Sequence, residues 1–154
     1  MQIGWKGYSQ IAYHEHGIII EAFTVHSCDE YHIEQGLNSI LKHVPNYESQ
    51  TDQNLIGAYS IAIFPDGRKT WVYMDLKKIL KRKQVSAAKD SDYSPWKKWF
   101  AEMCMKTVVR NHVNRLPKGH KSERMGWAIH HDNGGTDIEE ANVIVEEEKA
   151  IPAE

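Results

Sequence analysis

One segment constrains the fold more than any other, because it predicts a long amphipathic helix over residues 96–116. Ser94 can accept from the free amides at the helix start, Pro95 suits the first helical position, and Pro117 ends the segment. An apolar stripe at helical spacing needs a surface to pack against, so we expect this helix to lie on a sheet. The stripe consists of Trp96, Trp99, Phe100, Met103 and Thr107.

The upstream residues supply that sheet. Residues 55–64 and 69–74 are strand-like, and Pro65-Asp66-Gly67 between them offers the fixed φ and the positive-φ residue that a tight reversal needs, so we predict a hairpin. Residues 18–26 and 31–35 are rich in β-branched and aromatic residues and flank a polar turn. We interpret them as a second hairpin.

Two shorter helices are expected beside these strands. Residues 7–16 have a helical pattern that ends at Gly17. Asp75 is a plausible N-cap for a helix over residues 76–83, whose outer face is almost wholly basic. The predicted fold class is therefore α+β, a small antiparallel β-sheet of hairpins packed against a long C-terminal helix.

The length of 154 residues is typical of one domain. We divide it into a core of residues 1–121 and an acidic tail, residues 122–154, which has few large apolar residues and is expected to be mostly disordered. No apolar run approaches the roughly 18 residues that cross a bilayer, and no signal peptide is visible. We therefore expect a cytoplasmic protein.

The net charge of -2 conceals three blocks of different sign. Residues 1–64 carry a net charge of -5 and residues 125–154 a net charge of -7, whereas residues 65–124 hold sixteen basic and six acidic residues, a net charge of +10. A block of that charge attracts phosphate at long range, which is what a nucleic acid partner requires, but the charge alone indicates a merely solvated basic surface equally well.

The basic block contains the candidate DNA-binding side chains. Cations that follow the phosphates, with aromatic rings that stack on bases, are what single-strand binding requires. Of the candidate rings Trp5, Tyr8 and Trp96, we favour Trp5, because Trp96 and its helical neighbours fit a packed stripe. The candidate cations in the block include Arg68, Lys69, Lys77, Lys81, Lys97, Lys106 and Arg110.

The histidines invite a metal-site interpretation, particularly His14 with His16, and His26 with Cys28 and His32. Neither group matches a known ligand spacing, and zinc needs three or four converging ligands, so surface histidines are favoured. The cysteines lie outside any CxxC pair, and Cys104 is expected to be a buried, inert thiol. No catalytic constellation is visible, so we do not expect an enzyme.

Three stretches resemble the RecT family of phage and prophage single-strand DNA annealing proteins. Residues 2–8 (QIGWKGY), followed by a helix that ends at Gly17, are similar to one family segment, and the hairpin of residues 57–74 is similar to another. The resemblance covers residues 1–117. Its most specific part is Pro-Trp at 95–96, Lys-Thr-x-x-Arg at 106–110 and Leu-Pro at 116–117.

The resemblance implies single-stranded DNA binding and ATP-independent annealing of complementary strands in phage-type homologous recombination and repair. Carried over by position, it implies that Lys106 and Arg110 face phosphate in a groove, with Thr107 beside them packing or contacting phosphate, and that Trp5 and Lys6 contact the strand.

The resemblance also implies a homo-oligomer, as a ring or filament, that works with a 5′-to-3′ exonuclease and a host single-strand binding protein and has no membrane partner. No cofactor is expected, and magnesium is kept open as an unassigned aid to DNA binding.

Family members usually carry a helical region before these motifs, so we expect this chain to be an N-terminally shortened member. Two alternatives stay open. One is a metal-dependent nuclease or hydrolase that uses the histidine-rich segments. The other is an inactive, truncated remnant that acts through a full-length partner.

Overall fold

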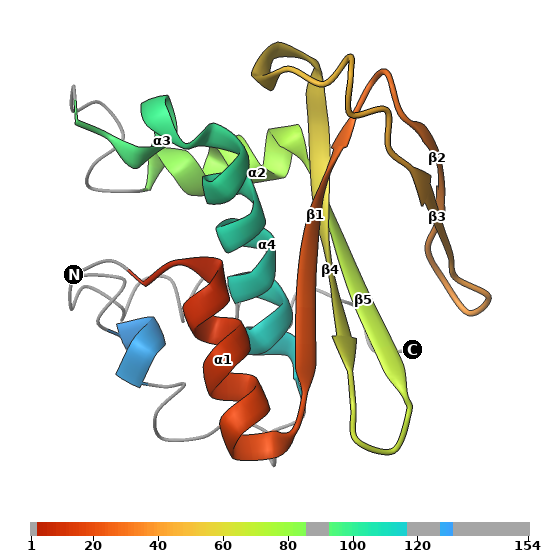
Figure 1. Cartoon of the computed structure of the whole chain (residues 1–154), viewed down its shortest axis with the longest axis vertical. Coiled ribbons are helices and arrows are strands. Elements are labelled where there is room, and N and C mark those ends of the chain that lie inside the picture. Colours follow the sequence, from red (N-terminus) through yellow and green to blue (C-terminus); the bar gives the residue numbers. More distant parts are fainter. Residues whose placement is uncertain (1–2, 86–92, 117–126, 131–154) are drawn as a thin grey trace, which may run out of the picture.

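The computed structural model of the chain describes residues 3–85, 93–116 and 127–130. Two antiparallel sheets and a set of helices make up these residues, so the predicted α+β class is confirmed (Figure 1). In chain order the elements are α1 (Trp5–His16), β1 (Ile19–His26), β2 (Glu30–Glu34), β3 (Ile40–Val44), the 3-10 turn η1 (Asp52–Asn54), β4 (Leu55–Ile63), β5 (Lys69–Asp75), α2 (Leu76–Gln84), α3 (Pro95–Lys98) and α4 (Phe100–Arg115).

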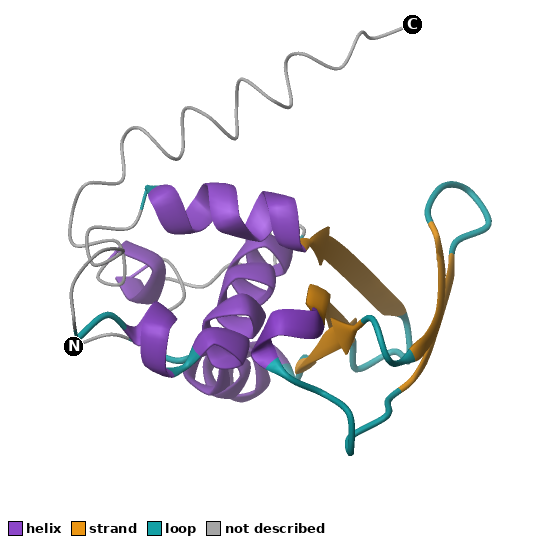
Figure 2. Cartoon of the chain, turned by 90° about the horizontal axis from the view of Figure 1, so that it is seen from above, coloured by secondary structure: helices purple, strands orange, loops and turns teal. Residues whose placement is uncertain are grey.

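The layers follow from a three-stranded sheet in the order β1-β4-β5. Helices α1 and α4 cover one face of this sheet, and the two-stranded sheet formed by β2 and β3 projects on the other side, as two perpendicular views agree (Figures 1 and 2). We call the surface formed by the helices the helix side, and the surface formed by the exposed face of the three-stranded sheet and the β2–β3 sheet the strand side.

The predicted hairpin of β4 and β5 is confirmed, with Ile63 opposite Lys69. Gly67 adopts a φ of 88°, which favours glycine, and its N–H donates to the Phe64 carbonyl at 2.9 Å. The residues of the turn, which are neighbours in sequence, therefore set the register in which β4 and β5 pair.

The prediction that residues 18–26 pair with residues 31–35 is wrong. Strand β1 pairs with β4, with Ile20 opposite Ala62, and β2 pairs with β3, a strand that we did not predict. An alternating pattern identifies strands but says nothing of their partners. In the fold, Asp29 turns the chain away from the sheet immediately after β1.

The buried carboxylate of Asp29 anchors the β2–β3 hairpin. It accepts from the backbone N–H of His26 at 3.0 Å and of Asn46 at 2.8 Å, from the Gln50 amide at 3.1 Å, and lies 2.8 Å from His43 Nε2. Burial alone would raise the pKa of Asp29, yet these donors hold it well below its usual range.

Removing this anchor is expected to destabilise the fold. Asp29→Ala leaves several buried donors without their acceptor and should lower the free energy of unfolding by about 3 kcal/mol in denaturant titrations. Glu34→Ala is the matched control, because its carboxylate pairs with His32 on the exposed surface of the same hairpin. That control should stay within about 0.5 kcal/mol of the parent, and equal stability of the two variants would contradict the anchoring role.

Two clusters of buried apolar side chains hold the helices on the inner face of the sheet. Small side chains of β4, Ala58 and Ala62, let the helices approach closely. The first cluster includes Tyr8 and Ala12 of α1, Ile20 of β1, and Val109 and Val113 of α4. The second includes Leu55, Met74, Ile79, Trp96, Cys104 and Val108.

The prediction of one helix over residues 96–116 is wrong at a single residue. Trp99, with φ -128° and ψ 52°, separates α3 from α4. The break lets Trp96 pack against Phe100, with ring centroids 6.4 Å apart, inside the second cluster. Trp96 is 4% exposed and Trp99 is 56% exposed, so the predicted packed stripe does not include Trp99.

The remaining helix predictions agree with the structure. Helix α1 begins at Trp5, two residues before the predicted start, and ends at Gly17, whose φ is 67°. Asp75 Oδ1 accepts from the Lys78 N–H at 2.9 Å, and Ser94 Oγ accepts from the Trp96 N–H at 3.3 Å, so both predicted caps are confirmed.

Of the predicted tail, residues 127–130 form a helical turn whose Ala128 joins the first cluster, and the others lie outside the described residues. In the described part of the chain, no helix has both the length and the apolar character needed to cross a membrane.

A buried histidine links α4 to two strands. His112 Nδ1 lies 2.9 Å from Ser60 Oγ in β4, and Nε2 lies 2.9 Å from Thr70 Oγ1 in β5. Burial, helped by the charge of Arg115, lowers the pKa of His112 to about 4. The imidazole is therefore neutral in the folded chain near neutral pH.

This histidine should make the fold sensitive to acid. Between pH 6.5 and about 4 the unfolded chain binds a proton at His112 that the folded chain does not, so stability falls as pH falls through this window. The contribution is about 3 kcal/mol. Denaturant titrations across this range should show a smaller loss for His112→Gln than for the parent, and an equal loss in the two proteins would contradict the role of His112.

Candidate nucleic-acid interface

Trp5 joins the start of α1 to the start of α4. Its indole Nε1 donates to Glu102 Oε2 at 3.0 Å, although the two residues lie 97 positions apart in the chain. The Nζ of Lys6 lies 5.9 Å from the Trp5 ring centroid. The hydrogen bond sets the orientation of a partly exposed ring beside a cation, which is the arrangement that base stacking uses.

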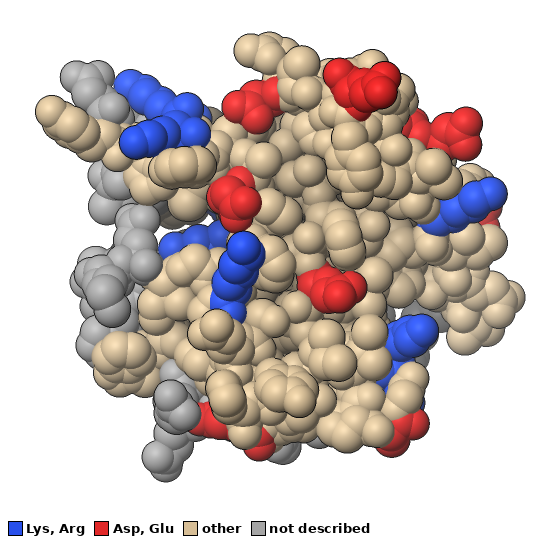
Figure 3. Space-filling model, in the orientation of Figure 1, with Lys and Arg blue, Asp and Glu red and all other residues tan. Residues whose placement is uncertain are grey.

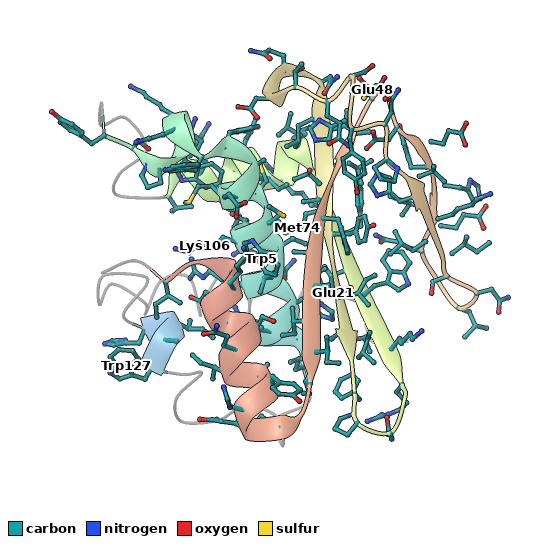
Figure 4. All side chains as sticks on the ribbon, viewed as in Figure 1. Trp5, Glu21, Glu48, Met74, Lys106 and Trp127 are labelled. Atoms are coloured by element: carbon teal, nitrogen blue, oxygen red, sulfur yellow. The ribbon has the colours of Figure 1, made fainter. Side chains whose placement is uncertain are left out.

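Helix α4 carries the residues of the Lys-Thr-x-x-Arg motif. Lys106 follows Glu102 by four positions and therefore lies on the same side of α4, and Figure 4 shows it near Trp5 where α1 meets α4. Lys106 is only 7% exposed, and Arg110 has a buried Nε. A direct contact between Lys106 and a phosphate therefore requires the side chain to leave this position.

The hydroxyl of Thr107 stays within its own helix. Its Oγ1 donates to the Met103 carbonyl at 2.8 Å, a backbone contact that threonine commonly makes in helices. Of the two roles that the resemblance implies for Thr107, this bond favours packing.

The accessible cations lie on α2 and α3. Lys77 and Lys81 are exposed one turn apart on α2, and Lys97 is exposed on α3. The two helices meet where Lys83 Nζ lies 6.0 Å from the Trp96 ring centroid. Figure 3 shows Lys and Arg side chains gathered over α3 and again between α3 and α1.

The structure does not bring Arg68 and Lys69 to this surface. They lie at the β4–β5 turn, at the opposite end of the molecule from α3 (Figure 1). The Arg68 Nε pairs with Asp66 Oδ2 at 2.8 Å, so its charge is already balanced. That Arg68 and Lys69 bind DNA remains a prediction, and their position in the structure does not support it.

Of the three candidate rings, the structure leaves only Trp5 partly exposed, because Tyr8 and Trp96 are buried in the core. Sequence reasoning missed the exposed ring of Trp99. The signal that could have found it is weak, since the helical pattern runs through the break without interruption.

Most of the acidic residues in the described part of the chain lie on the strand side, and Glu15 of α1 and Glu102 of α4 are exceptions on the helices. Glu21 and Glu48 lie on the strand side, away from Trp5 and Lys106 (Figure 4). Glu30 and Glu34 are exposed on β2. The helix side is therefore basic and the strand side acidic, which explains how a chain with a net charge of -2 presents a surface suited to a polyanion.

Metal ligands do not converge within the described residues, where no group of three His, Cys, Asp or Glu side chains could hold an ion. His26 bonds to Thr24 and Asn54, and His32 pairs with Glu34. Cys104 is fully buried, as predicted, and burial raises the pKa of its thiol to about 12.

A separate open cleft of about 510 Å³ lies between β2, β5 and the start of α2. None of the residues predicted to bind DNA lines it, and sequence reasoning did not find it because its residues come from separate segments. Its lining is Tyr31, His32, Ile33, Gln35, Tyr73, Asp75 and Lys78.

Comparison with known proteins gives one positive finding. The model of the RecT family matches residues 1–146 of the 154-residue chain, nearly its whole length. No curated protein matches the chain.

Proposed function

Because the chain belongs to the RecT family, we propose that it binds single-stranded DNA and anneals complementary strands without ATP in phage-type homologous recombination. RecT-family proteins are annealing proteins, and annealing makes and breaks no covalent bond. The proposed role therefore needs a surface that holds the strand, and it needs no nucleophile, general base or nucleotide site.

The observation that carries the proposal is the separation of charge between the helix side and the strand side. Two DNA strands repel each other through their phosphates, and cations that neutralise those phosphates remove part of this barrier. Lys77, Lys81 and Lys97 are exposed on the helix side, and in this proposal they hold the sugar-phosphate backbone. The base edges then stay free to pair with a second strand.

The proposal also covers the oligomeric state of the protein and its protein partners. A strand longer than one molecule can cover would be held by a homo-oligomer, as a ring or filament. A 5′-to-3′ exonuclease would supply the strand in the cytoplasm, and a host single-strand binding protein would compete for it. No cofactor is proposed, and a magnesium titration of DNA affinity would show whether the ion assists.

Salt dependence measures the number of phosphates that the helix side neutralises. Each contact contributes about -0.7 to the slope of log K against log salt for a single strand. If each of the three exposed lysines holds one phosphate, replacing Lys77, Lys81 and Lys97 together with Ala should flatten that slope by about 2 in anisotropy titrations with oligo-dT.

The control for this experiment is Lys42→Ala, which removes an exposed cation from β3 on the strand side. Its slope should equal that of the parent. An unchanged slope in the triple variant would show that these lysines of α2 and α3 do not contact DNA phosphates. A flattened slope in the control would show that the strand side also contacts DNA.

Annealing itself is tested with two complementary oligonucleotides that carry a donor and an acceptor fluorophore, mixed without nucleotide. The parent protein should accelerate pairing, Lys42→Ala should match it, and the triple variant should lose most of the acceleration at moderate salt. If the parent binds single strands but does not accelerate pairing, the annealing part of the proposal fails and the binding part survives.

A further inference from the structure

The break between α3 and α4 turns Trp99 outward. Its N–H donates to the Pro95 carbonyl at 2.7 Å, and its carbonyl accepts from the Met103 N–H at 2.9 Å. The backbone is therefore held on both sides, while 56% of the residue stays exposed. A single exposed tryptophan is not a site by itself, since soluble proteins expose many apolar atoms. Its neighbours decide whether it has a role.

Those neighbours are cationic. The Nζ of Lys98 lies 5.5 Å from the Trp99 ring centroid, and Lys97 is exposed on the same short helix. A ring beside flexible ammonium groups offers both of the contacts that a nucleotide takes, a flat surface for the base and a charge for the phosphate. One carboxylate, that of Glu102, lies in the first turn of α4, where it accepts from the Trp5 indole. The carboxylates of the strand side, which would repel phosphate, lie elsewhere in the fold.

Trp99 also lies close to the predicted strand contact. Glu102, which holds the Trp5 indole, follows Trp99 by three positions, about one helical turn along α4. Trp5 and Trp99 therefore flank the first turn of α4, and each has a lysine next to it in sequence whose Nζ lies within 6 Å of the ring centroid. The pattern is a repeated ring-and-cation pair.

We propose that the Trp99 ring is a stacking platform for a base of the bound single strand, with Lys98 holding an adjacent phosphate. This inference rests on the proposed single-strand binding and adds a second stacking position to that of Trp5. Stacking does not occupy the pairing edge of a base, so the platform fits a protein that must present the strand to its complement.

The experiment compares two strands with the same sugar-phosphate backbone, oligo-dT and a fully abasic oligonucleotide, by anisotropy titration of the full chain. Trp99→Ala should weaken oligo-dT binding by roughly 5- to 160-fold, the range for loss of one stacked base. Its affinity for the abasic strand should equal that of the parent. Trp99→Phe should recover much of the oligo-dT affinity, because it restores an aromatic ring.

Two further variants separate the contributions. Lys98→Gln should weaken both strands alike, because it removes a phosphate contact and leaves the ring. Tyr13→Ala removes a ring of similar exposure, 58%, from the other end of α1 and should leave both affinities unchanged.

Equal losses of Trp99→Ala on both strands, or no loss on either, would overturn the stacking proposal while single-strand binding stands. If the parent binds neither strand, the proposed function itself fails. Should Trp99→Ala not fold, the parent labelled with 5-fluorotryptophan provides the readout. The fluorine NMR resonance of Trp99 is assigned as the signal that is missing in Trp99→Phe. If the proposal holds, this resonance shifts on addition of oligo-dT and does not shift on addition of the abasic strand.

Discussion

The packing of α4 on the small side chains of β4 positions everything on the helix side of the molecule. Ala58 and Ala62 leave room for the valines of α4, and Ser60 bonds to the buried His112. Because protein interiors are close-packed, a larger side chain on this face of β4 would displace the helix as a whole. From α4 the other helices take their positions, α1 through Val109 and Val113 and α2 through the second core cluster.

The candidate interface follows from this arrangement. The buried face of α4 fixes how the helix is oriented on the sheet. Glu102, on its exposed side, therefore meets the start of α1 through the Trp5–Glu102 hydrogen bond. The same packing places Lys106 largely out of solvent and leaves the exposed cations to α2 and α3. A buried ammonium still contributes to the field of the helix side, but it offers less surface to a ligand than Lys77 or Lys97 does.

Local chemistry explains which predictions from sequence are confirmed. The β4–β5 turn needs a residue with positive φ, which Gly67 supplies, and the caps of α2 and α3 need a side chain oxygen, which Asp75 and Ser94 supply. All of these contacts span three positions or fewer. Long-range contacts explain the failures. Residues of β1 pair with residues of β4 that lie 29 to 44 positions further along the chain, and the exposure of Trp99 depends on the packing of Trp96 in the second core cluster.

The sequence by itself determined the α+β class, the hairpin, the helix caps, the separation of charge along the chain and the resemblance to RecT proteins, because each of these is encoded in residue types and short spacings. Only the tertiary structure decided which strands pair, that Lys106 is buried, and that one tryptophan of an apparently uniform stripe faces solvent. The physical reason is that burial is a property of the whole packed core. A periodic pattern reports which side chains could share a face, and the core determines which of them do.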